Sequence, residues 1–168
     1  AINSRMQRDK IAEYLKTVPA PWLLKPRSEA SSLGIKKLHT ADEAWKTIHE
    51  LGDLQSNYLI EKMIPGDVFH VDSIVSEGEV VFAECHGYKR PLFDIVNSGG
   101  IFGTRTLPRG SEIERSLLET HGRVVHHLGL KRGVTHTEYI RSKDDGEIYF
   151  LETAARVGGV HISDLVEA

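Results

Sequence analysis

The sequence predicts an α+β protein in which helices pack on mixed or antiparallel strands in two small lobes. Two observations carry this prediction. Several segments have apolar residues at helical spacing and begin at capping signals, and several strand-like segments are joined by tight turns. We expect residues 1–60 to form the smaller lobe and residues 61–168 the larger one.

The order of elements follows from these patterns. Thr40 and Ser111 are each followed three residues later by Glu, which predicts a capping box at the start of a helix. The strand over 68–75 alternates apolar with polar residues, so one of its faces should be buried. Residues 87–110 are rich in Gly and are expected to form a long active loop. The expected elements are a helix over 5–18, strands over 22–25 and 35–38, a helix from 41 to about 52, strands over 58–64, 68–75 and 79–86, a strand near 101–107, a helix over 112–128, and strands over 134–140 and 147–152.

The composition favours a reducing compartment and small ligands. The 168 residues include 21 Lys and Arg, 24 Asp and Glu and one Cys, and the net charge is -3. A single Cys excludes an internal disulfide and a Cys-rich zinc site, so we expect a cytoplasmic protein. The near-neutral charge gives no basic surface for nucleic acid or for a membrane, and no apolar run is long enough to span a bilayer.

The hairpin formed by the last two strands has the most informative geometry. Asp144-Asp145-Gly146 fits a three-residue loop that pairs Lys143 with Glu147. Counting back along both strands then places Glu138 directly opposite Glu152, with both side chains on one face and their Cβ atoms about 5 Å apart. A two-residue loop would shift the register by one and turn one Glu to solvent, and the turn geometry alone leaves both registers open.

Two carboxylates at this separation predict a metal site. At an effective dielectric near 20 their charges repel by about 3 kcal/mol, which a divalent cation would remove. Since the ligands are hard oxygens and there is no cluster of thiolates, Mg²⁺ or Mn²⁺ is the expected ion.

A second candidate site follows the first strand. Lys25 stands at the end of that strand, and Ser31, Ser32 and Gly34 follow it in a short loop. Such a loop can place hydroxyls and backbone N–H groups around phosphate oxygens while the lysine supplies positive charge. The loop lacks the Walker pattern, and no G-x-G-x-x-G follows a strand, so neither a P-loop enzyme nor a Rossmann domain is supported. The alternative is that Lys25 is a solvated charge at the edge of the strand.

Three other patterns have simpler explanations. His136-Thr137-Glu138 has the H-x-E spacing of zinc deaminases, but their C-x-x-C cannot exist in a chain with one Cys. Cys85 lies within a strand and is expected in the core. His70 and Asp72 share one face of their strand, where they either line a cleft or form a structural pair.

Three segments of the sequence stand out: residues 21–34, PWLLKPRSEASSLG, residues 59–66, LIEKMIPG, and residues 150–159, FLETAARVGG. Together they resemble the ATP-grasp superfamily, specifically its carboxylate-amine ligases such as D-alanine:D-alanine ligase and also biotin carboxylase cores. The first resembles the lysine-and-serine loop of these enzymes, the second their hinge, and the third the strand that carries metal ligands and an arginine. The three segments occur in the family's order and span nearly the whole chain.

The resemblance implies an ATP-grasp fold in which two lobes hold ATP, and it assigns nucleotide contacts. At the phosphates, Lys25 would contact the α- and β-phosphates, with the two loop serines above them. At the adenine, backbone groups of Lys62 and Ile64 would bind the ring, with Glu61 beside its amino group. The carboxylate that grips the ribose in the family falls at Val68 here, so the neighbouring Asp67 is the substitute. The nucleotide-binding residues implied are Lys25, Ser31, Ser32, Glu61, Lys62, Ile64 and Asp67.

The resemblance also implies how the reaction proceeds. A carboxylate substrate attacks the γ-phosphate of ATP, and an amine or thiol captures the resulting acyl phosphate. Glu138 and Glu152 would hold Mg²⁺ bridging the β- and γ-phosphates, and Arg156 would be the catalytic residue that stabilises the acyl phosphate and the tetrahedral intermediate.

The chain departs from the family's pattern in two ways. Ala154 stands where the family usually has an Asn that completes the binding of a second Mg²⁺, so a one-metal site or a substitute ligand such as His161 are the open alternatives. Nothing corresponds to the N-terminal α/β domain of the family, so we expect the larger lobe to be truncated and the chain to be part of a longer enzyme.

The predicted function is the ATP-binding core of an ATP-dependent carboxylate-amine or thiol ligase. A biotin-carboxylase-like carboxylase and a nucleotide-binding module without turnover, which Ala154 favours, are the alternatives. The expected partners are ATP, small carboxylate and amine substrates and the rest of the parent enzyme, and a homodimer is compatible with them.

Overall fold

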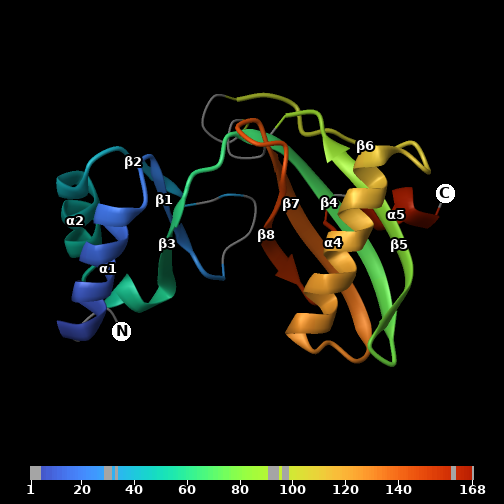
Figure 1. Cartoon of the computed structure of the whole chain (residues 1–168), viewed down its shortest axis with the longest axis horizontal. Coiled ribbons are helices and arrows are strands. Elements are labelled where there is room, and N and C mark those ends of the chain that lie inside the picture. The colour runs from blue at the N-terminus through green and yellow to red at the C-terminus, as the bar shows by residue number, and fades with distance from the viewer. Residues whose placement is uncertain are drawn as a thin grey trace. The chain divides into compact units, whose positions relative to one another are not determined.

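A computed structural model describes residues 5–28, 32, 34–90, 95, 99–159 and 162–167 of the chain (Figure 1). By its internal contacts the chain divides into two compact units, Ala1–Ile64 with Leu92–Gly99, and Pro65–Pro91 with Gly100–Ala168. The change of unit at Ile64 follows the end of a strand that pairs within the first unit, whereas a boundary at residue 60 would fall inside that strand. Each unit combines helices with an antiparallel sheet, which confirms the predicted α+β class.

The first unit is a three-stranded antiparallel sheet with helices packed against it. The sheet order is β2-β1-β3, and β1 pairs with both neighbours. Trp22, Leu24 and Leu38 are buried with Leu15 and Ile48 in one apolar core, so one face of the sheet is covered by helices. Leu23 and Lys25 lie on the opposite face because side chains alternate along a strand. The elements are α1 (Arg5–Thr17), β1 (Trp22–Pro26), β2 (Lys36–Leu38), α2 (Ala41–Glu50), the 3-10 helix η1 (Gly52–Asn57) and β3 (Tyr58–Lys62).

The second unit is a five-stranded antiparallel sheet with a long helix across one face (Figure 1). The sheet order is β6-β5-β4-β7-β8, so β4 is the central strand. Helix α4 covers the face on which Val71, Cys85 and Tyr139 are buried with Leu117 of the helix. The elements are β4 (Gly66–Ser76), β5 (Glu79–Tyr88), β6 (Thr104–Thr106), α4 (Glu112–Leu128), β7 (Gly133–Ser142), β8 (Ile148–Ala154) and the short α5 (Ile162–Glu167).

The local signals in the sequence act as predicted. The Thr40 hydroxyl accepts a hydrogen bond from the Glu43 N–H at 3.1 Å, and Ser111 accepts one from the Glu114 N–H at 3.3 Å, so both residues cap their helices as predicted. The returning bonds reach one residue further than in a capping box, because Glu43 and Glu114 accept from the N–H groups of His39 and Gly110. Gly129 ends α4 in the left-handed conformation with φ of 69°. Of the long loop expected over 87–110, residues 91–94 and 96–98 lie outside the described residues, and β6 is the strand expected near 101–107.

The alternation along β4 divides the larger sheet into two chemically different faces. Phe69 and Val71 point to the apolar side beneath α4. His70 and Asp72, one residue out of phase, lie on the other side, and both are buried. The sheet therefore has an apolar face and a face with buried ionisable groups. Among the helices of the described residues, none combines the length and the apolar composition needed to cross a bilayer.

Helix α4 carries three histidines, and of these only His121 is buried against the apolar face of the sheet. Its Nδ1 is 2.8 Å from the Tyr139 hydroxyl and its Nε2 is 2.9 Å from the Ser73 hydroxyl. Burial lowers the pKa of His121 to about 4, and the attraction of the Asp72 carboxylate offsets this only in part. The imidazole is therefore neutral in the folded protein at neutral pH.

This neutral histidine predicts a loss of stability in mild acid. Below its ordinary pKa of about 6.5 the unfolded chain binds a proton at His121 that the folded protein does not bind until about pH 4. The free energy of unfolding should therefore fall by roughly 2 kcal/mol between pH 7 and pH 5 because of this group. Urea denaturation at both pH values measures it. The fall should be smaller by this amount in His121→Gln and unchanged in His126→Gln, a change on the exposed side of α4.

Candidate functional site

The hairpin of β7 and β8 brings Glu138 and Glu152 together. The strand register pairs Glu138 with Glu152, Thr137 with Thr153 and His136 with Ala154. Directly paired residues of antiparallel strands point to the same face, so the two carboxylates share one face of the sheet. The predicted pairing of Glu138 with Glu152 is confirmed.

The turn that was expected to set this register is different. The Ser142 N–H donates to the Glu147 carbonyl at 2.9 Å, so Ser142 and not Lys143 faces Glu147 across the hairpin, and the predicted three-residue loop is wrong. The register then shifts between Glu138 and Tyr139, where a β-bulge adds one residue to β8. The bulge compensates for the longer loop. It restores the pairing of the two carboxylates, which the turn alone would have lost.

Glu138 is held by two side chains that the sequence analysis did not assign to the site. The Tyr88 hydroxyl donates to Glu138 Oε1 at 2.6 Å, and His136 Nε2 lies 3.7 Å from the same oxygen. Burial would raise the pKa of Glu138, but the interactions with His136 and Tyr88 outweigh it and lower the pKa. Burial of the phenol, the nearby charge of Glu138 and the same hydrogen bond raise the pKa of Tyr88 well above its usual range. Glu138 is therefore ionised, and Tyr88 keeps its proton.

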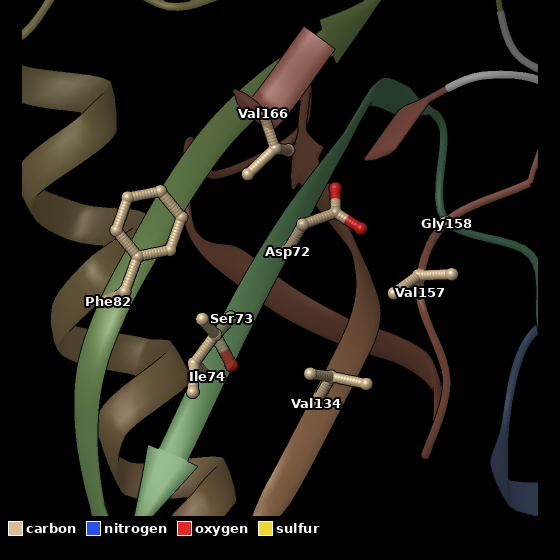
Figure 2. Close-up of a pocket in the computed structure, with 8 residues that line it drawn as sticks. All are labelled: Asp72, Ser73, Ile74, Phe82, Val134, Val157, Gly158 and Val166. Carbon is tan, nitrogen blue, oxygen red and sulfur yellow. The ribbon is translucent and has the colours of Figure 1, made fainter. Parts of the chain in front are cut away.

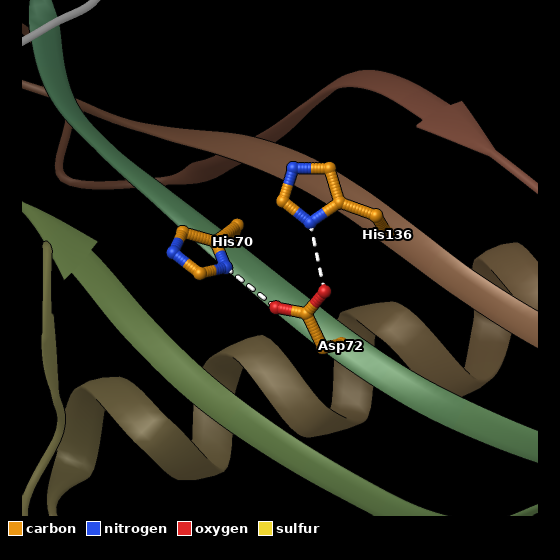
Figure 3. Close-up of side chains that lie close together, drawn as sticks. All are labelled: His70, Asp72 and His136. Carbon is orange, nitrogen blue, oxygen red and sulfur yellow. Dashed lines mark hydrogen bonds and ion pairs between the residues drawn. The ribbon is translucent and has the colours of Figure 1, made fainter. Parts of the chain in front are cut away.

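His136 is in turn held by Asp72 of the central strand (Figure 3). Its Nδ1 is 2.8 Å from Asp72 Oδ1, while Asp72 Oδ2 is 2.7 Å from His70 Nδ1. Burial would lower the pKa of His136, but the carboxylates of Asp72 and Glu138 raise it to about 9. Burial would likewise raise the pKa of Asp72, and hydrogen bonds from His136 and His70 lower it well below its usual range. The three groups form a row of alternating charge, from Asp72 through His136 to Glu138.

This row of charged groups changes the explanation of how the paired carboxylates tolerate each other. The sequence suggested that a cation alone compensates their repulsion. In the structure, the imidazolium of His136 and the hydroxyl of Tyr88 already stabilise the charge on Glu138. Glu152, opposite, is exposed on the same face. The residues still fit a divalent cation, because two carboxylates stand directly opposite each other on one face of the sheet, and the one Cys lies on the other face.

The polar face continues across β5 with His86, which is buried there like His70 and His136. The ring of His86 stacks on His70 with centroids 4.7 Å apart and an interplanar angle of 9°. Burial and the neighbouring His70 lower the pKa of His86 to about 4, despite the attraction of Asp72. His86 is therefore neutral, and it adds no charge to the row formed by Asp72, His136 and Glu138.

A cavity of about 320 Å³ lies on the same face of the larger sheet, beside Asp72 (Figure 2). Val157 and Gly158, which follow β8, face Asp72 and Val134 across it. Gly158 comes so close to the sheet that a Cβ atom there would lie 2.9 Å from Asp72 Oδ1. Only a glycine fits at this position without displacing the Asp72 carboxylate. The cavity is lined by Asp72, Ser73, Ile74, Phe82, Val134, Val157, Gly158 and Val166.

In the first unit, β1 and β3 place Lys25 beside Glu61. Lys25 is buried, and its Nζ is 3.0 Å from Glu61 Oε1. The register pairs Lys25 with Leu59 and Leu23 with Glu61, so the ammonium and the carboxylate are diagonal neighbours on the face away from the apolar core. The alternative of a solvated Lys25 at the strand edge is wrong.

The other residues of the first unit that were predicted to bind the nucleotide lie in the loop after β1 and at the end of β3. Ser31 lies outside the described residues, whereas Ser32 adopts a left-handed conformation with φ of 58°. Lys62 ends β3 with an exposed side chain, and Ile64 follows it in irregular backbone. Backbone groups at these two positions remain the predicted adenine contacts.

Asp67 and Arg156 lie apart from the paired carboxylates. Asp67 is exposed on the face of β4 opposite to His70, and its Oδ1 is 3.5 Å from Lys143 Nζ. The structure therefore does not bring Asp67 together with Glu138. Arg156 is exposed just after β8, where its guanidinium donates to the Val157 carbonyl at 2.8 Å. His161, the suggested substitute ligand, lies outside the described residues.

The residues that the sequence analysis missed are Tyr88 and the ionic role of His136. His136 has a sequence signal, since it stands two residues before Glu138 on the same strand face. Tyr88 has none, because its contact with Glu138 crosses two strand pairings and spans 50 positions of the chain.

The two α+β units, together with opposed carboxylates on one sheet face, are the arrangement expected of an ATP-grasp protein. Residues 18–164 match the ATP-grasp domain family. The match covers most of the 168 residues, and the chain belongs to this family. The recognition based on three sequence segments is confirmed.

Individual relatives agree with this assignment. The L-arginine-specific L-amino acid ligase of Bacillus subtilis is 28% identical over 153 residues, which are 88% of this chain and 36% of the ligase. An L-amino acid ligase structure from Bacillus licheniformis has a TM-score of 0.64 at 22% identity and covers 94% of this chain and 37% of its own. The D-alanine–D-alanine ligase from Bacillus anthracis has a TM-score of 0.63 at 17% identity, covering 92% and 48%. The chain thus spans about a third of the length of the curated relative that it matches.

The contact with Tyr88 predicts how Glu138 titrates. In Tyr88→Phe the carboxylate loses a hydrogen bond that favours its charged form, so the pKa of Glu138 should rise. The free energy of unfolding should fall by about 1.5–3 kcal/mol, the range for a hydrogen bond to a charged group. NMR titration of the side-chain carboxyl carbons measures the pKa. Tyr149→Phe is the matched control, since it removes an exposed hydroxyl bound to Asp145; an unchanged Glu138 titration in Tyr88→Phe would contradict the contact.

Proposed function

We propose that this chain is the ATP-binding core of an ATP-dependent ligase that joins a carboxylic acid to an amine or a thiol. The observation that carries the proposal is the pairing of Glu138 with Glu152 in a chain that belongs to the ATP-grasp family. The relationship to an amino acid ligase supports the ligase over the other chemistries. We also propose the cytoplasm as its compartment, since the single Cys85 is a buried free thiol.

In the first unit, Lys25 is the proposed contact to the α- and β-phosphates. Its ammonium is buried against Glu61, so it is positioned rather than free to sample solvent. Ser31 and Ser32 are the proposed loop contacts to the phosphates. Glu61 and the backbone of Lys62 and Ile64 are the proposed adenine contacts. The ion pair of Lys25 with Glu61 links these two sets of contacts within one sheet.

In the second unit, Glu138 and Glu152 are the proposed ligands of Mg²⁺ or Mn²⁺. The ion would neutralise charge on the phosphates of ATP as they are transferred. Tyr88 and His136 keep Glu138 ionised and fix its orientation, which prepares one ligand before the ion binds.

Arg156 is the proposed catalytic residue. The carboxylate of the acid would attack the γ-phosphorus of ATP and release ADP, which gives an acyl phosphate. The amine would then attack the acyl carbon, displace phosphate and lose a proton. Negative charge develops on the oxygens at both steps, and a guanidinium just beyond β8 supplies fixed positive charge for them. Asp67 remains a proposal for the ribose, although it lies on the face of β4 opposite to Glu138.

Two other functions make different predictions for turnover. A biotin-carboxylase-like enzyme shares the nucleotide site but activates bicarbonate. A binding module without turnover is suggested by Ala154, which offers no ligand where the family usually has Asn.

Calorimetric titration with ATP tests the proposed site directly in the 168-residue chain. Lys25→Met should weaken ATP binding about 10–100-fold, because a hydrogen bond to a charged group is worth about 1.5–3 kcal/mol. Lys46→Met, on the exposed side of α2, should leave the affinity unchanged. If Lys25→Met and the unsubstituted chain bind ATP with equal affinity, Lys25 is not part of the site.

The metal ligands are tested in the same way. In Glu138→Gln combined with Glu152→Gln, the affinity for ATP should no longer depend on Mg²⁺, since the amide oxygens carry no charge. Circular dichroism checks that the fold is intact. A folded double variant that retains the full Mg²⁺ dependence would place the ion elsewhere.

Release of ADP by the full-length parent enzyme distinguishes the three functions. A ligase should release ADP only when both a carboxylic acid and an amine are present. Bicarbonate should suffice for a carboxylase, and a binding module should bind Mg-ATP without releasing ADP in any mixture. ADP release driven by bicarbonate alone would overturn the ligase proposal.

A further inference from the structure

Four positions form a rectangle on the polar face of β7 and β8. His136 pairs with Ala154, and Glu138 pairs with Glu152, so all four side chains point to the same side of the sheet. Three of the corners carry groups that can bind a metal ion. The fourth corner, Ala154, offers only a methyl group and no ligand atom.

The imidazole of His136 is oriented like that of a metal-bound histidine. Its Nδ1 is fixed by Asp72 at 2.8 Å, and the second ring nitrogen lies on the side away from Asp72 (Figure 3). Carboxylate groups commonly hold one nitrogen of a ligating histidine in this way, so that the other nitrogen faces the ion. In this chain the other nitrogen, Nε2, faces Glu138.

The distance between the two donors fits a shared ion. His136 Nε2 is 3.7 Å from Glu138 Oε1, which is longer than a hydrogen bond. Two donors that are each about 2.1 Å from one ion lie roughly 3 Å apart when adjacent and roughly 4.2 Å apart when opposite. The observed separation lies between these values, so small side-chain rotations would bring both donors to one ion.

The charges on this face also favour a cation beside His136. The carboxylates of Asp72 and Glu138 lie 2.8 Å and 3.7 Å from the two ring nitrogens, and Glu152 faces Glu138 on the next strand. An ion bound at Nε2 would replace the proton on that nitrogen, as metal binding to histidine requires.

From this geometry we propose that His136 is a third protein ligand, through Nε2, of the divalent ion held by Glu138 and Glu152. The inference rests on the proposed function, because it concerns the same ion. His136 thereby supplies from β7 a ligand that Ala154 cannot supply from β8. An imidazole among carboxylates favours Mn²⁺ over Mg²⁺ in comparison with a site made of oxygens alone.

Pulsed electron paramagnetic resonance of Mn²⁺ tests this ligand without any turnover. The 168-residue chain is studied with Mn²⁺ and ATP in the absence of acid and amine. A coordinated imidazole nitrogen gives a ¹⁴N modulation of the electron spin echo, and in protein labelled with ¹⁵N-histidine the modulation should change to that of ¹⁵N. The labelled parent chain needs no substitution, so the measurement does not depend on a variant that folds.

Variants then identify the histidine. His136→Gln should abolish the histidine modulation. It should also weaken Mn²⁺ binding by at least about tenfold, because even the loss of a group that only orients a metal ligand weakens binding by about that much. The affinity of this variant for Mg²⁺ should fall less than its affinity for Mn²⁺. His126→Gln, an exposed histidine on α4, should leave both the modulation and the affinities unchanged.

The outcomes separate this inference from the proposed function. Modulation that is lost only in His136→Gln supports the ligand. Mn²⁺ binding that depends on Glu138 and Glu152 but shows no histidine modulation overturns the role of His136 and leaves the carboxylate site standing. Mn²⁺ binding that is unaffected by removal of both carboxylates overturns the metal site and this inference together.

Discussion

The interaction on which the polar face depends is the pair of hydrogen bonds from His70 and His136 to the carboxylate of Asp72. A buried carboxylate is costly unless both of its oxygens are paired. Asp72 lies on the central strand β4, and its partners come from β4 itself and from β7. The charge of Asp72 holds His136 as an imidazolium, and His136 in turn stabilises Glu138 at the next position of the same strand face.

Strand pairing transmits this constraint from the centre of the sheet to its edge. The pairing of β4 with β7 is regular from Gly66 to Val75 and sets Asp72 opposite His136. The pairing of β7 with β8 is interrupted by a bulge, yet it still sets Glu138 opposite Glu152. Gly158 then passes close above Asp72, where a larger residue would collide with the carboxylate. The row of ionisable groups therefore depends on one regular ladder, one bulge and one glycine.

The position of the paired carboxylates was predictable from the sequence, but for an incomplete reason. A loop of three residues was expected to set the register, whereas the hydrogen bond of Ser142 with Glu147 shows a longer loop. The bulge in β8 restores the pairing, and no local signal in the sequence marks it. The compensation of charge was likewise assigned to a cation alone, although His136 and Tyr88 contribute to it within the protein.

The sequence by itself determined the beginnings of α2 and α4, the alternation along β4 and membership of the ATP-grasp family. The helix starts and the alternation depend on residues only a few positions apart, so neighbouring side chains and hydrogen bonds are enough to specify them. Family membership follows from three short segments, each of which is a local pattern of residues. Only the tertiary structure decided that Tyr88 binds Glu138 and that Asp72 orients His136, across 50 and 64 positions of the chain. Such contacts require strands distant in sequence to pair in one register, and that register is set by the packing of the whole sheet.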